Sequence, residues 1–313
     1  MDDVKALFEP LQVKSKVLRN RIVMPPMLVS RGVITPESQE WYGRRAEGGV
    51  GMVIVESTSV VRFGLDYHAE NLQPLVQSIH NGGALAAIQL YPGMVGQRDS
   101  PNQMTTEQIE QLIAQFRVAA TICAEAGFDG VEPHGAHGFL LNQFFSPIQN
   151  KRTDEYGDTL EGLMRLALSI VKTVHDVAEN KDMLILYRHT PIGAGYEIEE
   201  SLILAEELIK AGIDILDISP ASDSTPADNA APFMKFGIPI IAVNEMDKVQ
   251  RACEALREKR ATLIAVGRGL IADPDWANKV REGRMDEIVE CIHCNECFSD
   301  LSKGIPVGCT QWD

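Results

Sequence analysis

Short apolar runs alternate with longer segments of helical periodicity along almost the whole chain. The runs are rich in Ile, Val, Leu and Ala, which is expected of parallel strands that are buried on both faces. They lie at residues 21–24, 50–55, 84–90, 128–132, 183–187, 213–218, 238–243 and 261–266. Eight strand–helix units favour an α/β fold of the (β/α)8 TIM-barrel type over a doubly wound sheet.

Several helix boundaries can be read from the sequence. Thr35-Pro36 predicts the start of a helix over 37–47, and a long helix from Thr106 is expected to end at Gly127. Residues 227–235 form a weaker helix candidate. Because the sequence contains neither an internal repeat nor a linker rich in Pro, Ser and Gly, we expect one barrel over residues 1–287 and a short cysteine-rich extension over residues 288–313.

Length and charge exclude several classes of function. A chain of 313 residues suits a TIM barrel with insertions, and a net charge of −15 argues against nucleic-acid binding through a basic surface. No apolar run reaches the ~18 residues that a membrane-spanning helix needs. The N-terminus lacks an apolar signal core. We therefore expect a cytoplasmic protein with no membrane or nucleic-acid partner.

The most polar stretch between strands covers residues 131–157 and contains His134 and His137 beside Gly135 and Gly138. Its Gly, Asn, Gln and Pro content predicts a long loop that leaves the carboxyl end of a strand, where barrels place their binding groups. Two neutral imidazoles there would offer N–H donors to a carbonyl or carboxylate oxygen. Alternatively, both histidines are ordinary loop residues.

Two other strand ends carry candidate binding groups. Arg188 is a cation at the tip of an apolar strand, so it needs an anionic or strongly polar partner, either a ligand or a carboxylate of the barrel. Residues 267–269, Gly-Arg-Gly, follow the eighth run and open a helix. Barrels often bind phosphate at this place, so these residues predict a phosphate cradle.

Taken together, these segments resemble the old yellow enzyme family of FMN-dependent oxidoreductases over nearly the whole chain. The resemblance is carried by residues 20–27, by the stretch 134–157, which matches the most specific signature of the family, and by residues 266–274. It implies FMN contacts from Pro25, Pro26, Met27, Ser57, Gln89 and Arg188 around the ring system and from Asn244, Gly267 and Arg268 at the phosphate. Gln89 would bond the pyrimidine edge, and Arg188 would stabilise the anionic reduced flavin. His134 and His137 would be the catalytic pair that grips a substrate carbonyl oxygen.

Four cysteines cluster near residue 300, namely Cys291, Cys294, Cys297 and Cys309. In a cytoplasmic chain such a cluster indicates a metal rather than disulfides. The spacing resembles the [4Fe-4S] motif of the 2,4-dienoyl-CoA reductase and trimethylamine dehydrogenase branch, and a four-thiolate zinc site is the alternative. In that branch flavin- and nucleotide-binding domains follow the barrel, whereas this sequence stops at Asp313. Any cluster would therefore exchange electrons with a separate donor protein.

Two departures from the family pattern bear on the chemistry, and a lesser one is Gly162-Leu163, where the family commonly has Asn-Arg. Phe139 stands where the family has a tyrosine that donates a proton, and Leu28 stands where it has a Cys or Thr that bonds the flavin. A proton would then come from water or from another tyrosine, with Tyr67, Tyr91 and Tyr187 as candidates. If the site is tuned to a substrate that needs no acid, a hydroxyl at position 139 would be a buried polar group without a partner.

The resemblance implies an FMN-dependent oxidoreductase that reduces an activated C=C bond of a small-molecule substrate, an enone, enoate or enoyl thioester. Hydride would pass from flavin N5, with NAD(P)H or a partner protein as the electron source. One alternative is an amine or N-methyl dehydrogenase that runs in the oxidative direction. Another is a flavin electron-transfer module without turnover of its own. A homo-oligomer is compatible with all three.

Overall fold

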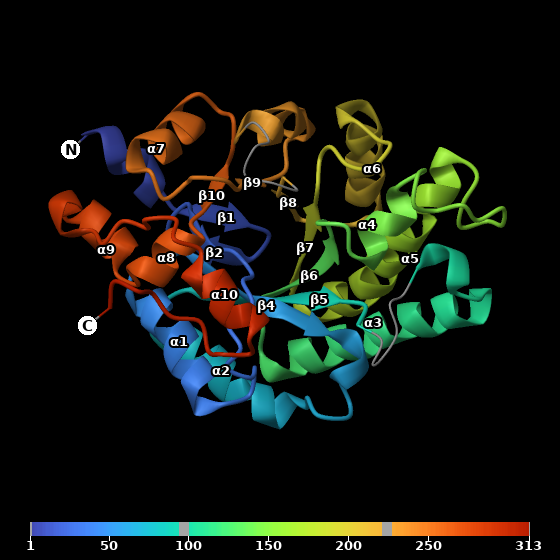
Figure 1. Cartoon of the computed structure of the whole chain (residues 1–313), viewed down its shortest axis with the longest axis horizontal. Coiled ribbons are helices and arrows are strands. Elements are labelled where there is room, and N and C mark those ends of the chain that lie inside the picture. Colours follow the sequence, from blue (N-terminus) through green and yellow to red (C-terminus); the bar gives the residue numbers. More distant parts are fainter. Residues whose placement is uncertain (1, 94–99, 221–226, 313) are drawn as a thin grey trace.

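The computed structural model describes residues 2–93, 100–220 and 227–312. Eight parallel strands form a closed barrel in the order β10-β3-β4-β5-β6-β7-β8-β9 (Figure 1). The strands are β3 (Ile22–Met24), β4 (Met52–Ser59), β5 (Leu85–Tyr91), β6 (Gly130–Gly135), β7 (Leu184–His189), β8 (Ile215–Ile218), β9 (Ile240–Ala242) and β10 (Leu263–Ala265). The predicted TIM barrel is confirmed, because a doubly wound sheet would be open at both edges.

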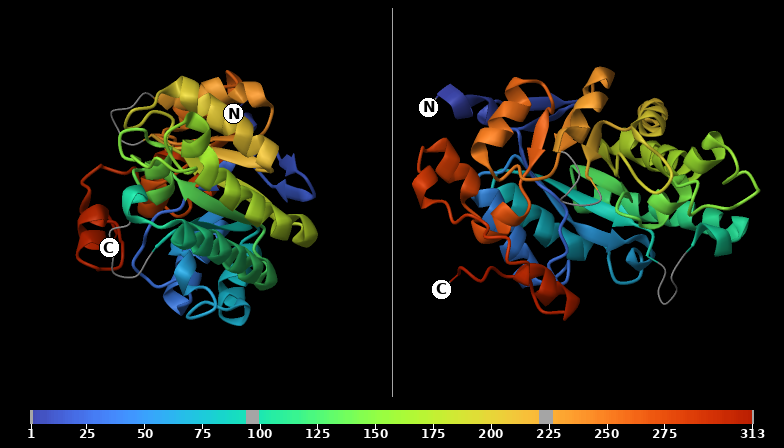
Figure 2. Two further views of the ribbon diagram at one scale, coloured as in Figure 1. Left: turned by 90° about the vertical axis from the view of Figure 1, so that its right-hand side faces the viewer. Right: turned by 45° about the horizontal axis from the view of Figure 1, so that its top comes forward.

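Helices surround the strands on the outside of the barrel, as the two views in Figure 2 show. The α-helices are α1 (Pro36–Glu47), α2 (Ala69–Asn81), α3 (Thr106–Ala126), α4 (Leu140–Phe145), α5 (Leu160–Ala178), α6 (Ile198–Ala211), α7 (Val249–Arg257), α8 (Arg268–Ala272), α9 (Trp276–Arg281) and α10 (Glu296–Ser302). Short 3-10 helices are η1 (Asp2–Phe8), η2 (Val60–Arg62), η3 (Pro101–Gln103), η4 (Glu179–Lys181), η5 (Ala227–Phe236) and η6 (Met285–Glu287). None of the helices in the described ranges could span a bilayer.

Helix ends follow the local chemistry of the sequence. The Thr35 hydroxyl accepts the amide of Ser38 at the start of α1, and Thr105 caps α3 in the same way. Gly127 ends α3 in a left-handed conformation with a φ of 91°, which glycine adopts at little cost. The weak helix candidate at residues 227–235 is the 3-10 helix η5, which contains Pro232. Proline lacks the N–H that an α-helical turn would use there.

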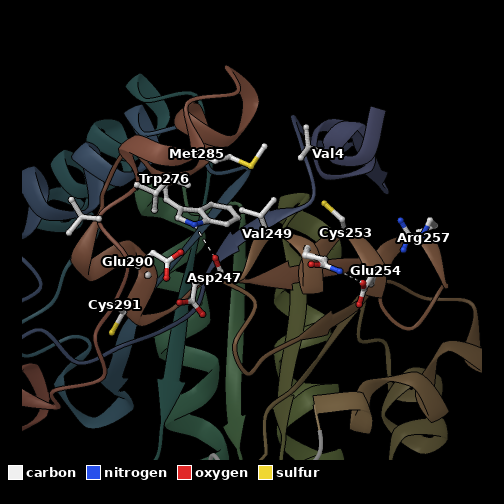
Figure 3. A pocket seen from close by; sticks show the side chains of 14 residues that line it. Val4, Asp247, Val249, Cys253, Glu254, Arg257, Trp276, Met285, Glu290 and Cys291 are labelled. Atoms are coloured by element: carbon white, nitrogen blue, oxygen red, sulfur yellow. Dashed lines mark hydrogen bonds between the residues drawn. The ribbon is translucent and has the colours of Figure 1, made fainter. Parts of the chain in front are cut away.

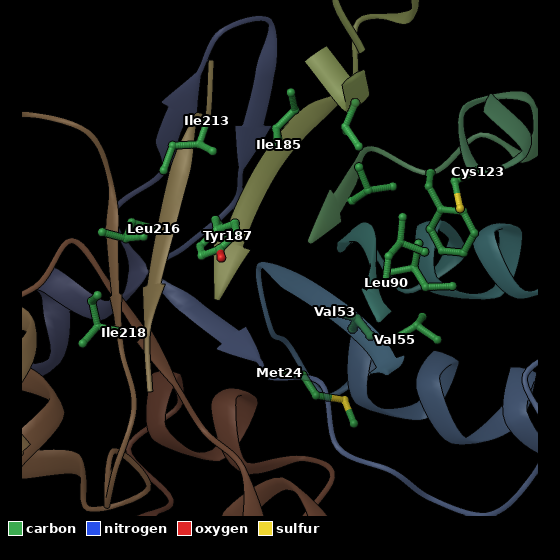
Figure 4. Close-up of a cluster of buried hydrophobic side chains, with 14 of the residues drawn as sticks. Met24, Val53, Val55, Leu90, Cys123, Ile185, Tyr187, Ile213, Leu216 and Ile218 are labelled. Carbon is green, nitrogen blue, oxygen red and sulfur yellow. The ribbon is translucent and has the colours of Figure 1, made fainter. Parts of the chain in front are cut away.

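Alternating side chains of each strand enter two separate cores. Outward side chains pack against the helices and include Val53, Val55, Ile185, Leu216 and Ile218 (Figure 4). Inward side chains fill the barrel and include Ile54, Ala87, Leu186, Ile215 and Ile241. An antiparallel hairpin, β1 (Leu11–Val13) with β2 (Lys16–Leu18), adds Val13 and Leu18 to the inner core. The hairpin therefore lies against the barrel interior, and the sequence pattern did not predict it.

The predicted long loop at residues 131–157 is wrong in two places. Strand β6 continues to Gly135, because His134 pairs with Arg188 in the register of β7. Farther on, residues 140–145 form the helix α4, whose apolar side chains are buried. His134 is therefore held on a strand of the barrel, and only His137 lies on the loop that follows.

Candidate active site

A cavity of about 590 Å³ opens at the carboxyl ends of strands β3, β7, β9 and β10, where TIM barrels place their active sites. Its volume lies within the range of small-molecule and cofactor sites, about 300–1,000 Å³. Most of the predicted cofactor residues line it, namely Pro25, Met27, Arg188, Asn244, Gly267 and Arg268. Pro26, Ser57 and Gln89 lie outside this wall. The structure thus gathers six of the nine predicted cofactor residues around one cavity.

Arg188 faces both the cavity and the barrel. Its Nη2 donates to the Ser219 hydroxyl at 3.0 Å, and its Nη1 donates to the carbonyl oxygen of Pro26 at 3.4 Å. Its Nε lies 3.3 Å from Oδ2 of Asp217, a carboxylate fully buried in the barrel. The barrel carboxylate that the sequence offered as one of two partners is therefore present. The guanidinium also lines the cavity, where it would meet a ligand.

Four polar side chains form a layer at the top of the barrel interior. Gln89, Arg188 and Asp217 each lie two residues beyond an apolar inward residue of their own strand, and side chains two apart share a face. The fourth is Glu132, which faces Gln89 in the register of β5 and β6. Gln89 Nε2 donates to Glu132 Oε1 at 2.8 Å. The side chain of Gln89 is thereby fixed by a neighbouring strand.

Glu132 and Asp217 have unusual titration behaviour for carboxyl groups. Burial, together with the nearby Asp217 carboxylate, raises the pKa of Glu132 to about 8, although Arg188 opposes the shift. Burial also raises the pKa of Asp217, and again Arg188 acts in the opposite direction. Within the described ranges, Glu132 Oε2 and both oxygens of Asp217 are buried without a hydrogen-bond partner. Sequence reasoning missed Asp217, although a charge inside the apolar run Ile-Leu-Asp-Ile was a readable signal.

The two histidines lie side by side, with ring centroids 5.2 Å apart. His137 Nε2 is 2.8 Å from the Ser219 hydroxyl, which leaves Nδ1 as the ring nitrogen that this hydroxyl does not contact. His134 Nδ1 is buried with no hydrogen-bond partner among the described residues. Burial, with the nearby Arg188 cation, lowers the pKa of His134 well below its usual value and that of His137 to about 3. Both rings are therefore neutral at physiological pH, and each carries one N–H.

A hydrogen-bond network holds the loop that carries His137. The His137 backbone has a φ of 58°, and its amide donates to the Thr190 hydroxyl at 2.9 Å. Asn142 accepts the amide of Gly138 at 2.9 Å and donates to the Tyr196 hydroxyl at 2.6 Å. Tyr196 in turn donates to the carbonyl of Thr190 at 2.9 Å. The left-handed backbone of His137 is thus supported from the end of β7.

The candidate proton donors occupy three different environments. Tyr91 lies beside Phe139, with ring centroids 6.1 Å apart in an edge-to-face arrangement. Tyr67 is buried between Phe63 and the guanidinium of Arg62. Tyr187 is buried among the outward side chains that pack against the helices (Figure 4). Tyr91 is connected to His134 through the ring of Phe139, whereas the side chain of Tyr187 lies against Gly135, the residue that follows His134.

The four tail cysteines border one small cavity of about 20 Å³, together with Arg268 and Asn295. Arg268 Nη1 donates to Asn295 Oδ1 at 3.2 Å, which connects the predicted phosphate end to the tail. Cys297 and Phe298 also line the large cavity. In the part of the chain that the structure describes, no group of three or more His, Cys, Asp or Glu is placed to hold a metal ion. The predicted metal site stays a prediction.

A second large cavity, of about 470 Å³, lies outside the barrel between η1, α7, α9 and residues 285–291 (Figure 3). Trp276 Nε1 donates to the Asp247 carbonyl at 3.2 Å on one side of it. Arg257 and Glu254 lie on the other side (Figure 3). Asp247 lines both this cavity and the large cavity at the strand ends. Cys291 lines both this cavity and the small cavity of the tail. Two predicted site residues line it, Cys291 and Gly269, the last residue of the predicted phosphate cradle.

Sequence comparison finds a match to one protein family and to several characterised relatives. The profile of the NADH:flavin oxidoreductase / NADH oxidase family matches residues 6–100 and 93–287. An NADH oxidase of Thermoanaerobacter brockii is 32% identical over 92% of this chain and 52% of its own length. An NADPH dehydrogenase of Halalkalibacterium halodurans is 34% identical over 86% of this chain and 92% of its own. The chain thus spans about half the length of the first relative and nearly all of the second.

A comparison of structures agrees with the sequence match. Morphinone reductase in complex with tetrahydroNAD superposes with a TM-score of 0.78 at 26% identity. The superposition covers 89% of this chain and 91% of the reductase chain. The superposed region therefore includes most of the chain and is not confined to one part of the barrel.

Proposed function

This chain belongs to the NADH:flavin oxidoreductase / NADH oxidase family, and from that premise we propose that it is an FMN-dependent oxidoreductase of the old yellow enzyme type. The observation that carries the proposal is the cavity at the carboxyl ends of the strands, whose wall combines the Arg188 cation with Gly267 and Arg268. The similarity to an NADH oxidase and to an NADPH dehydrogenase supports NADH or NADPH as the electron source.

The residues of the cavity suit the parts of FMN. Arg188 presents a guanidinium for the electron-rich side of the ring system, and Pro25 and Met27 offer apolar surface for its face. At Gly267 an added Cβ would approach Met27 Sδ to 3.5 Å and Pro25 Cγ to 3.7 Å, inside the cavity wall. Glycine therefore leaves this space beside Met27 and Pro25 empty, next to Arg268 on the same wall. When bound, FMN would supply the hydride chemistry.

On the substrate side, His134 and His137 would hold a carbonyl oxygen through neutral N–H groups. A neutral donor stabilises a developing oxyanion without being lost to deprotonation at physiological pH. Phe139 and Tyr91 add an aromatic wall beside His134. These features fit a small planar substrate with a carbonyl-activated C=C bond.

An oxidative amine or N-methyl dehydrogenase is the second candidate. It is favoured by Phe139, since the family position for a proton donor holds a ring without a hydroxyl. Oxidation of an amine does not require protonation of a carbon atom. Turnover of cyclohexenone and enoyl substrates, compared with oxidation of methylated amines, separates the two candidates. A protein that binds flavin but turns over neither class would be an electron-transfer module.

For the tail we propose a [4Fe-4S] cluster held by Cys291, Cys294, Cys297 and Cys309. The support is the convergence of all four cysteines on one small cavity next to the flavin cavity. Four thiolates are the usual ligand set of a cubane cluster, and they also suit zinc. At about 20 Å³ the cavity has room for about one water, so the tail would open to admit a metal centre.

The test of the flavin assignment is FMN binding by two matched arginine variants. Arg268→Ala changes the wall of the cavity, whereas Arg117→Ala changes an arginine on α3 that pairs with Asp176, and neither of these two residues lines the cavity. Titration of the flavin-free protein with FMN should show weaker binding for Arg268→Ala and wild-type binding for Arg117→Ala. Failure of the wild-type protein to bind FMN, or equal losses in both variants, would refute the proposal.

A further inference from the structure

Glu132 and Asp217 form a pair of buried carboxyl groups with no role in the proposed flavin contacts or the substrate clamp. Both are 0% exposed inside the barrel. They lie on β6 and β8, on either side of the strand that carries Arg188. The register pairs Arg188 with Asp217, and Glu132 lies two residues before His134 on the same face of β6. Arg188 is therefore the one cation beside two buried carboxyl groups among the described residues of this layer.

The charge balance of this group requires one proton. The charged groups that face Glu132 are Asp217 and Arg188, and the neighbouring histidines are neutral. Gln89, on the other side, contributes an uncharged amide. If both acids were ionised, the closed interior would carry a net negative charge, which burial strongly disfavours. One of the two acids must then be protonated.

Geometry identifies which acid and which oxygen hold the proton. Asp217 Oδ2 is 3.3 Å from Arg188 Nε, and this contact favours the ionised form of Asp217. Glu132 Oε1 accepts an N–H from Gln89, so it is the acceptor oxygen of that carboxyl group. Its other oxygen, Oε2, is buried and has no partner among the described residues. The proton therefore belongs on Oε2 of Glu132.

We propose that Glu132 stores a proton beneath the cavity, and that this proton is kept or released to solvent according to the charge placed above Arg188. An ionised Glu132 would offset the positive field of Arg188, whereas a protonated Glu132 leaves that field available. Glu132 would accordingly make the affinity of the site for negative charge, and with it the reduction potential of bound FMN, depend on pH. The second half of this inference rests on the proposed function.

The stored proton can be observed in the purified protein, whether or not flavin is bound. An infrared titration in D₂O, from pH 5 to pH 10, should show the C=O band of a buried carboxylic acid that disappears near pH 8. Glu132→Gln should lack that transition, because the amide cannot ionise. Glu56→Gln is the matched control, since Glu56 is a second buried acid whose carboxylate accepts the Val29 amide at 2.9 Å. It should keep the transition.

Asp217→Asn provides an independent variant. Because it removes the negative charge that opposes ionisation of Glu132, the infrared transition should move to lower pH. An unchanged transition in Glu132→Gln, or no shift in Asp217→Asn, would overturn the assignment of the proton to Glu132.

The coupling to charge is tested by the midpoint potential of FMN-loaded protein between pH 6 and pH 10. The wild-type curve should show an inflection of one proton that Glu132→Gln lacks and Glu56→Gln retains. The Glu132→Gln potential should lie above the wild-type potential at pH 9. Identical curves for the wild type and Glu132→Gln would disprove the coupling. If the protein binds no FMN, the proposed function fails, while the infrared titration still tests the stored proton.

Discussion

The ring of Phe139 lies 5.0 Å from that of His134, centroid to centroid, and at 46% exposure it is open to solvent. The expectation that a hydroxyl at this position would be buried without a partner is therefore wrong. A tyrosine hydroxyl here could reach water. The loss of the family tyrosine bears on chemistry beside His134, not on the packing of the core.

Phe139→Tyr should leave stability unchanged, because a substitution at an exposed position usually alters the free energy of unfolding by no more than about 0.5 kcal/mol. We also expect no gain in enone reduction, since Leu28, 47% exposed on the cavity wall, departs from the family pattern as well. Single-turnover oxidation of the reduced enzyme by an enone measures the effect. General acid catalysis typically contributes about 10²-fold or more to a rate. A gain of even about tenfold in Phe139→Tyr would therefore contradict this expectation and indicate an ene-reductase that has lost its acid.

Arg188→Ala should weaken FMN binding and also destabilise the barrel. Removal of one partner of a buried ion pair typically costs about 3–5 kcal/mol, because the other charge is left uncompensated. Adding Asp217→Asn should recover most of the stability and none of the FMN affinity. Urea unfolding and flavin titration of the single and double variants separate the two roles. Recovery of FMN binding in the double variant would mean that Arg188 acts only through the barrel.

His134→Ala should reduce turnover of a carbonyl-activated alkene while reduction of the flavin by NAD(P)H stays nearly intact. Loss of one oxyanion donor costs about 10²–10³ in rate. His137→Ala should show the same pattern, with an added effect from loss of the Ser219 contact. Stopped-flow measurement of the two half-reactions gives both rates. Normal oxidative half-reactions in both variants would make the histidines structural.

Acid should destabilise the folded chain through its buried histidines. Burial lowers the pKa of His189, which bonds the Ser201 hydroxyl, to about 3. The unfolded chain then binds more protons than the folded chain below the ordinary histidine pKa near 6.5, so stability is lost as pH falls from about 6.5 to 3. At pH 5.5 the loss is about 1.4 kcal/mol for each such histidine. Urea unfolding at pH 7.5 and pH 5.5 should show a smaller difference for His189→Gln than for the wild type. The exposed His68→Gln is the control.

Anaerobically purified protein should contain about four iron and four labile sulfide atoms per chain, the content of one cubane cluster. Cys294→Ser should lower both. Cys253→Ser, which changes a buried thiol on α7 outside the tail, should lower neither. Elemental and sulfide analysis of the three proteins provides the measurement. Stoichiometric zinc without labile sulfide would replace the cluster with a zinc site.

The strand–helix order of the barrel was predictable because each buried strand had to be an apolar run. The observed ends of the elements differ from the predicted ends where pairing between strands determines them. His134 joined β6 through its pairing with Arg188, although its Gly-rich surroundings predicted a loop. The hairpin β1–β2 was missed, since its residues contribute too few apolar side chains to form a recognisable run.

The residues of the candidate site at the strand ends could be predicted from the sequence, but the buried contacts beneath them could not. Strand-end residues such as Arg188 and Gly267 stand out in sequence, because charge and glycine interrupt apolar runs. The partner of Gln89 could not be found in this way. Glu132 meets it only through the register of β5 and β6, which depends on how the whole barrel closes.

The tail contributes part of the wall around the large cavity through Asn295, Cys297 and Phe298. The proposed flavin and the proposed metal centre would therefore be thermodynamically linked, because the same segment borders both cavities. Such linkage is reciprocal: a metal centre that tightens flavin binding by some factor is itself held more tightly by that factor. If that factor exceeds one, a chelator that acts on the cysteines would also weaken flavin binding, and a flavin-free chain would hold its metal centre less tightly.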